Sequence, residues 1–162
     1  MASGVSKEVR GRRAEHAIYG SIIVLAVIVA EDSALITTRV AIATVLGAAL
    51  VTSLAHVYAD YIGELIRAGR HPSREERQTD LKNAAFGFTV SIFPVAFFVL
   101  AALGAITLDA AFDFAEWVGV AVIGGYSFGA NLLAGLPLGR SLLIGLGFTV
   151  LGAGLVALKI VL

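Results

Sequence analysis

The sequence predicts an all-α integral membrane protein with five transmembrane helices. Three observations favour this fold class: the composition is very apolar, the apolar residues form five long stretches, and the basic residues gather between those stretches. Hydrophobic residues make up 58% of the 162 positions and charged residues only 15%, whereas soluble domains average at most about a half and about a quarter. A soluble domain of this length has too little interior to bury so much apolar surface.

Five stretches are long enough to cross a bilayer, which takes roughly 20 mostly apolar residues and no fewer than about 17. They cover about residues 14–30, 40–61, 83–108, 116–134 and 141–162. The first stretch is not a cleavable signal peptide, because acidic residues rather than small ones follow its apolar core. The predicted organisation is therefore a basic tail over residues 1–13 and a single transmembrane domain over 14–162, with a cytoplasmic connector at about 67–82.

The distribution of Lys and Arg predicts the orientation. The tail holds four basic residues, the connector holds five and the turn before the last stretch holds Arg140, so five spans place ten of the twelve on one side of the membrane. Loops rich in Lys and Arg stay in the cytoplasm. We therefore expect the N-terminus inside and the C-terminus outside, in the inner (plasma) membrane of a prokaryote.

Local signals predict a turn in the connector and a bend in the third stretch. The second helix is expected to continue into the connector, break near residues 69–72 and restart at Ser73, which fits a capping box with Glu76. Pro94 lies in the middle of the third stretch, where the loss of a backbone hydrogen bond is expected to kink the helix.

The fourth stretch carries a GxxxG motif, formed by Gly125 and Gly129. Small residues let membrane helices approach closely. Packing within the bundle and a dimer interface both fit this motif. Asn131, in the same stretch, needs a hydrogen-bond partner in hydrocarbon. It is expected to bridge two helices, with the lining of a pathway as the alternative.

The second stretch carries a polar stripe of His56, Asp60 and Glu64. Each step of four residues rotates about 40° around a helix, so the three side chains share one face. Glu15 and His16 open the first stretch on the same side of the membrane, and two antiparallel neighbours would let these groups meet. An ionisable residue at the centre of a span costs about 2.5–3.5 kcal/mol on insertion, so such residues are functional candidates.

Two chemistries fit these five residues. Imidazole and carboxylate groups are ligands for Zn²⁺, Fe²⁺ or Mn²⁺, which makes all five candidate metal ligands of a transport site. The same ladder could relay protons, since imidazole titrates near neutral pH. A structural alternative pairs Asp60 with a buried histidine, and Glu64 with Arg67. An enzyme is not expected, because the chain has no catalytic motif and no cysteine. We expect no covalently bound cofactor. We also expect no nucleic-acid partner, because the sequence does not predict a basic face on a soluble domain.

The predicted arrangement of spans and one stretch of sequence resemble those of the vacuolar iron transporter (VIT-like) family. The family's second span commonly carries a motif like S-M-A-A-G-E-Y-V, and residues 54–62 here place Asp60 at its glutamate and His56 at its methionine. Tyr19 and Gly20 stand where the family has an A-N-D-G-like motif, whose aspartate has no counterpart in this chain. The resemblance implies five spans, a homodimer and exchange of a divalent metal for protons.

These observations predict a small, proton-coupled membrane transporter of a divalent transition-metal cation, iron-like or manganese-like. His56 and Asp60 are expected to bind the ion, with Glu64 at the inner mouth and Glu15 or His16 contributing. The expected partners are the lipid bilayer, the metal ion and a second copy of the chain. Two alternatives stay open: a structural or regulatory membrane subunit without transport, and a proton or monovalent-cation channel.

Overall fold

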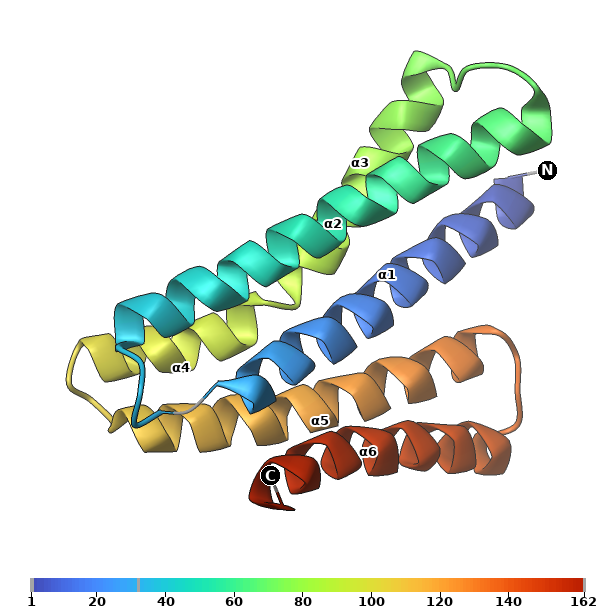
Figure 1. Ribbon diagram of the computed structural model, residues 1–162. Helices are drawn as coiled ribbons and strands as arrows, with labels where there is room; N and C mark the ends of the chain where they lie inside the picture. Colours follow the sequence, from blue (N-terminus) through green and yellow to red (C-terminus); the bar gives the residue numbers. More distant parts are fainter. Residues whose placement is uncertain (1, 32, 162) are drawn as a thin grey trace.

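The computed structural model describes residues 2–31 and 33–161, and within those ranges all the regular structure is helical (Figure 1). The helices, in chain order, are α1 (Ala2–Ala30), α2 (Thr38–Ala68), α3 (Arg74–Thr89), α4 (Ile92–Ala102), α5 (Leu108–Leu133) and α6 (Leu138–Val161). The helix α1 is central, because it contacts α2 and α3 on one side and α5 and α6 on the other. The predicted all-α class is confirmed for the described residues.

In the described part of the chain, three helices are long and apolar enough to cross a membrane: α1 from Arg13 onward, α2 and α6. The consecutive helices α3 and α4 would together make a fourth candidate span. Large apolar side chains cover the outer faces of α2 and α6, among them Leu50, Val51, Leu54, Leu143, Leu146, Val150 and Leu151. This exterior fits a bilayer. The count of five spans, which requires α5 to cross as well, and the orientation both stay predictions.

The basic tail is not separate from the first predicted span. Residues 2–13 belong to α1, so one continuous helix of 29 residues replaces the expected tail and span. No glycine or proline break lies between the two parts except Gly11, and a single helical glycine costs only about 1 kcal/mol relative to alanine. The basic residues of this segment therefore extend the helix instead of forming a loop.

The connector follows the predicted course. The helix α2 continues to Ala68 and ends at Gly69, whose φ of 63° is the left-handed conformation that favours glycine. The helix α3 begins directly after Ser73. The Ser73 hydroxyl accepts from the Glu76 backbone N–H at 3.2 Å, and the Glu76 carboxylate accepts from the Ser73 N–H at 2.6 Å. The predicted capping box is confirmed.

The third predicted span, residues 83–108, is divided between two helices. The chain forms α3 and α4, bent by 43° at Val90 and Ser91. The bend lies just before Pro94, which cannot donate to the carbonyl of Val90 four residues earlier and whose ring crowds that carbonyl. Ser91 stabilises the break, because its hydroxyl donates to the Phe88 carbonyl at 2.7 Å. The predicted kink is thus confirmed, and it lies just before the proline.

The boundary between the third and fourth predicted spans is also corrected. The helix α4 ends at Ala102, and Gly104 turns the chain with a φ of 75°. Leu108, expected to end the third span, is the first residue of α5, because the Thr107 hydroxyl caps that helix by accepting from the Ala110 N–H at 3.2 Å. The helix α5 therefore starts eight positions before the predicted Glu116.

Glycine packs α5 against α6, but at a different register from the GxxxG motif. A Cβ added to Gly124 would overlap the Thr149 hydroxyl and lie 3.3 Å from the Gly145 carbonyl oxygen, whereas one added to Gly125 or Gly129 would meet nothing within 4 Å. The close approach therefore depends on Gly124 and Gly145. Among the described residues, the GxxxG pair makes no such helix contact.

Asn131 satisfies its amide within its own helix. Its Nδ2 donates to the Ser127 carbonyl at 2.7 Å, so the expectation that it bridges two helices is wrong. A turn of the same helix supplies an acceptor at i−4, which removes the need for a partner on another helix.

Candidate ion-binding site

The buried face of α2 leads directly into the polar stripe. Ala41, Val45, Ala49 and Thr52 are the buried residues of α2, and they recur every three or four positions as expected for one helix face. His56 continues the same spacing and is half-buried, as is Asp60 one turn later. The stripe therefore lies against α1 rather than on the apolar exterior.

His16 of α1 lies at the centre of the site. Its side chain is only 4% exposed, and its Nε2 lies 3.4 Å from Oδ2 of Asp60, which is 26% exposed. The separation suits an ion pair when the imidazole is protonated but is long for a strong hydrogen bond. The predicted meeting of the first two helices is confirmed for this pair.

His56 joins the cluster through its ring. Its ring lies against that of His16, with ring centroids 4.4 Å apart. The exposed Tyr19 ring packs against His56 in a T-shaped arrangement, with ring centroids 4.9 Å apart. Its Nδ1 lies 2.9 Å from the Thr52 carbonyl oxygen. A carbonyl can only accept, so this nitrogen carries the hydrogen, and in the neutral ring Nε2 keeps its lone pair. His16, His56 and Asp60 are called the His–Asp cluster below.

Two polar atoms of the His–Asp cluster are left without hydrogen bonds. Nδ1 of His16 and Oδ2 of Asp60 are both buried and have no hydrogen-bond partner. Most buried polar groups in proteins are satisfied, because an unsatisfied one costs about 1–3 kcal/mol. The unsatisfied atoms mark this cluster as a place where an added proton or cation would gain interaction energy.

A close approach of α3 fixes the position of His16. A Cβ added to Gly87 would lie 3.3 Å from both the Cβ and the carbonyl oxygen of His16, and the Gly87 carbonyl oxygen lies close to Gly20. The backbones of the two helices are in close contact here, and the imidazole of His16 lies against α2. A small cavity of about 10 Å³ separates the three helices beside His16 and His56.

The other two candidate ligands lie outside the cluster. Glu15 is exposed on α1. Glu64 is 27% exposed and accepts from Arg67 at 3.1 Å, which is the pairing of the structural alternative. Within residues 2–31 and 33–161, no group of three or more His, Asp and Glu side chains is arranged to hold a metal ion. The cluster thus supplies metal-ligand chemistry from two helices without a preformed metal cage.

The sequence patterns gave no role in the site to three residues that shape it. Tyr19 covers the His56 ring, the Thr52 carbonyl fixes its tautomer, and Gly87 admits the His16 backbone. The spacing of Thr52, four positions before His56, could have indicated the first turn of the stripe. The Gly87 contact joins residues 71 positions apart, and no local pattern indicates it.

Comparison with known proteins identifies no relative. No family model, no curated protein and no solved structure matches the chain. The resemblance to the vacuolar iron transporters therefore stays a prediction, and the function has to be argued from the site.

Proposed function

We propose that the protein is a small membrane transporter that exchanges protons for a divalent transition-metal cation, iron-like or manganese-like, at the His–Asp cluster. One observation carries the proposal: the buried His16 lies 3.4 Å from Asp60, and each side chain has a buried atom without a hydrogen bond. Ionisable residues inside a membrane span are costly, and they commonly mark an ion or proton pathway.

Competition for the same atoms couples the two ions. A proton on the imidazole of His16 makes the ring a cation that pairs with the Asp60 carboxylate. When the proton leaves, the imidazole lone pair and the carboxylate become available, and His56 offers a second imidazole nitrogen. Nitrogen and oxygen ligands of this kind suit Fe²⁺, Mn²⁺ or Zn²⁺. Since a ring nitrogen cannot hold a proton and a metal together, binding of one ion releases the other.

The connector end of the bundle gives the route to the cluster. Asp60 is partly exposed, and Glu64 lies one helical turn nearer to the connector. Glu64 is held by Arg67 rather than by the cluster. We therefore assign Glu64 to the entrance, where its ion pair with Arg67 can open without disturbing His16.

The decisive test is a transport assay in proteoliposomes that contain a pH-sensitive dye and a metal-sensitive dye. A gradient of Fe²⁺ or Mn²⁺ should drive metal entry and opposite proton movement. Asp60→Asn should abolish both fluxes, because the amide can neither pair with protonated His16 nor supply a charged ligand. Asp113→Asn, which neutralises an exposed acid on α5, is the matched control and should transport normally. Unchanged transport by Asp60→Asn would disprove the assignment.

Metal binding can be checked separately by thermal stability in detergent. An ion at a hundredfold excess over its dissociation constant stabilises the folded state by about 2.7 kcal/mol if it binds that state alone. Among Fe²⁺, Mn²⁺, Zn²⁺, Co²⁺, Ca²⁺ and Mg²⁺, we expect stabilisation by a transition metal only, and loss of the shift in Asp60→Asn.

A second candidate function is a proton or monovalent-cation pathway. The observation that favours it is that the described His, Asp and Glu side chains form no group of three suited to a metal. Proton flux without any metal gradient, abolished by Asp60→Asn, would select this function. If a folded protein moved neither ion, the result would reject both and favour a structural or regulatory subunit.

A further inference from the structure

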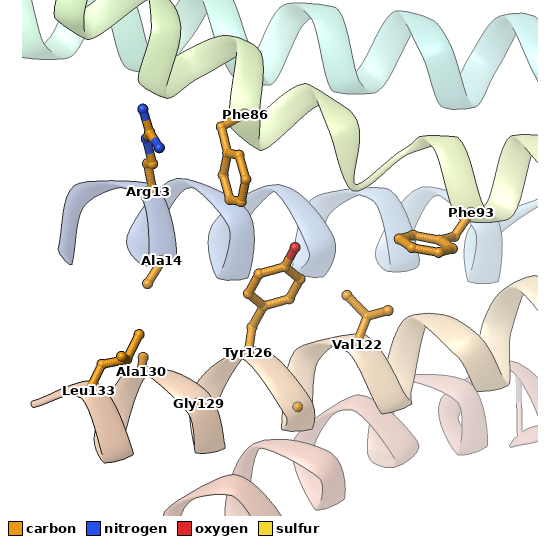
Figure 2. Close-up of a pocket in the computed structure, with 10 residues that line it drawn as sticks. Arg13, Ala14, Phe86, Phe93, Val122, Tyr126, Gly129, Ala130 and Leu133 are labelled. Carbon is orange, nitrogen blue, oxygen red and sulfur yellow. The ribbon is translucent and has the colours of Figure 1, made fainter. Parts of the chain in front are cut away.

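A second cavity, larger than the space beside His16, lies on the other side of α1. It is a groove of about 610 Å³ between α1, the α3–α4 pair and α5. Figure 2 shows Arg13 and Leu133 towards one end and Phe93 towards the other, with the Tyr126 ring projecting from α5 towards α1. Phe93 is 53% exposed and Leu133 is 62% exposed, so the groove is open to the outside of the bundle along its length.

The lining is apolar except for Arg13, at the end near the N-terminal half of α1, and the Tyr126 hydroxyl. Phe86, Phe93 and Val122 supply apolar side chains, and Gly125 and Gly129 leave the wall at α5 without side chains. Pockets of roughly 300–1,000 Å³ with apolar walls and a few polar groups are typical ligand sites. Because the outer surface of the helices fits a bilayer, the medium that meets this groove is the acyl-chain region of the membrane.

Arg13 gives the groove a cationic end. Its Nε donates to Oδ1 of Asn83 at 3.3 Å, and its guanidinium carbon lies 5.8 Å from the centroid of the Phe86 ring. Asn83 is 1% exposed, so it holds the arginine from a fixed position. Among the side chains that the structure describes, no carboxylate lies within ion-pair distance of Arg13. Among these side chains the guanidinium is therefore oriented without a counter-charge.

We propose that this groove binds an anionic phospholipid of the surrounding membrane, with an acyl chain along Phe86, Phe93 and Val122 and the phosphate at Arg13. The charge is complementary, since basic pockets between membrane helices bind anionic headgroups. The inference is independent of the transport proposal, because no residue of the His–Asp cluster lines the groove.

A second copy of the chain fits this groove less well. Two copies in one membrane share their orientation, so both Arg13 side chains would meet the interface at the same depth. Like charges at one level oppose association. An anionic lipid brings the opposite charge to that level.

The test measures lipid binding to the purified full chain by native mass spectrometry, with dioleoyl phosphatidylglycerol and dioleoyl phosphatidylcholine as probes. One basic residue near an anionic headgroup is worth about fivefold in affinity. The wild type should therefore bind phosphatidylglycerol about fivefold more tightly than phosphatidylcholine. Arg13→Gln should bind both lipids equally, and Arg13→Lys should keep most of the preference. Gly129→Leu, which fills the groove, should weaken binding of both lipids.

The matched control is Gly147→Leu, which adds the same side chain to an exposed, open position of α6 outside the groove. It should bind both lipids like the wild type. Equal binding of the two lipids by the wild type would overturn the proposal. Lipid binding by Gly129→Leu equal to that of Gly147→Leu would also overturn it. If Gly129→Leu then converted a dimer to a monomer, the occupant of the groove would be a second copy of the chain.

Discussion

Two partly buried ion pairs lie on opposite sides of the bundle. They are similar in burial but differ in how fully their polar atoms are hydrogen-bonded. On the α5–α6 side, Lys159 donates to Glu116 at 2.7 Å, with exposures of 30% and 6%. On the α2–α3 side, His16 and Asp60 are 3.4 Å apart, with exposures of 4% and 26%. The first pair forms a short, charge-assisted hydrogen bond. The second lacks that bond and keeps two unsatisfied atoms.

The two pairs also differ in the kind of cation that each contains. The amine of Lys159 also lies 5.1 Å from the centroid of the Phe112 ring, which adds a cation–π contact. Lysine is charged throughout the neutral range, whereas imidazole gains and loses its proton there.

The largest expected effect is the loss of the complete pair. Lys159→Met would leave Glu116 charged and buried without a partner, which should lower the free energy of unfolding by about 3 kcal/mol. Equilibrium unfolding in mixed micelles with a denaturing detergent measures this loss. The double variant Lys159→Met with Glu116→Gln should recover most of it, because no buried charge is then left. A loss below about 1 kcal/mol in the single variant would contradict the structural role of the pair.

The next effect separates the two glycine registers of α5. Gly124→Ala should lower the free energy of unfolding by about 1–3 kcal/mol, because the added methyl group meets Thr149 and the Gly145 backbone. Gly125→Ala, one residue later, points into open space and should be neutral or slightly stabilising through its better helix propensity. The same unfolding titration compares both variants. Equal losses would show that the α5–α6 seam does not depend on the Gly124 register.

Sequence periodicity indicated the fold class and the polar stripe because both are local. The connector was predictable to within a residue, since Gly69, Ser73 and Glu76 each act on neighbouring backbone groups. Pro94 indicated a bend for the same reason. The basic charge of residues 2–13 predicted a tail, whereas the structure continues the helix through them. Lys and Arg are good helix formers, so their charge does not indicate a helix boundary.

The site was only partly predictable, because long-range packing decides which polar residues meet. The meeting of His16 with Asp60 followed from the antiparallel order of two helices. The rotation of each helix decided the rest: Glu15, next to His16, is exposed, and Glu64 turns to Arg67. The choice of Gly124 over Gly125 for the α5–α6 seam is likewise a property of how α6 packs, which a GxxxG count cannot show.

A double variant sharpens the comparison of the two pairs at the level of stability. His16→Leu with Asp60→Leu removes the incomplete pair and should change the free energy of unfolding by less than about 1 kcal/mol, since apolar groups can replace an imperfect buried pair without loss. Transport should nevertheless disappear. The unfolding titration and the proteoliposome assay together check this. A loss of stability as large as that of Lys159→Met would show that the cluster is structural.

The smallest effect concerns an ion pair outside the spans. In the connector, Arg70 donates to both Glu76 oxygens, at 2.8 and 3.0 Å, and these bonds, with those from Ser73, hold the pKa of Glu76 at about 2, below its ordinary value of 4.5. A lowered folded-state pKa means that the carboxylate's contribution is complete above about pH 4.5 and is lost as the pH falls towards 2.

Hydrogen exchange of the first α3 amides therefore provides the measurement. Protection should be constant from pH 7 to about 5 after correction for the intrinsic rate, and should fall between pH 4.5 and 2. Glu76→Gln should show weaker protection above pH 5 and no step below it. The pair is solvent-exposed, so screening limits its effect on global stability. A step of the same size in Glu76→Gln would assign the titration to another group and leave the start of α3 dependent on the Ser73 hydroxyl alone.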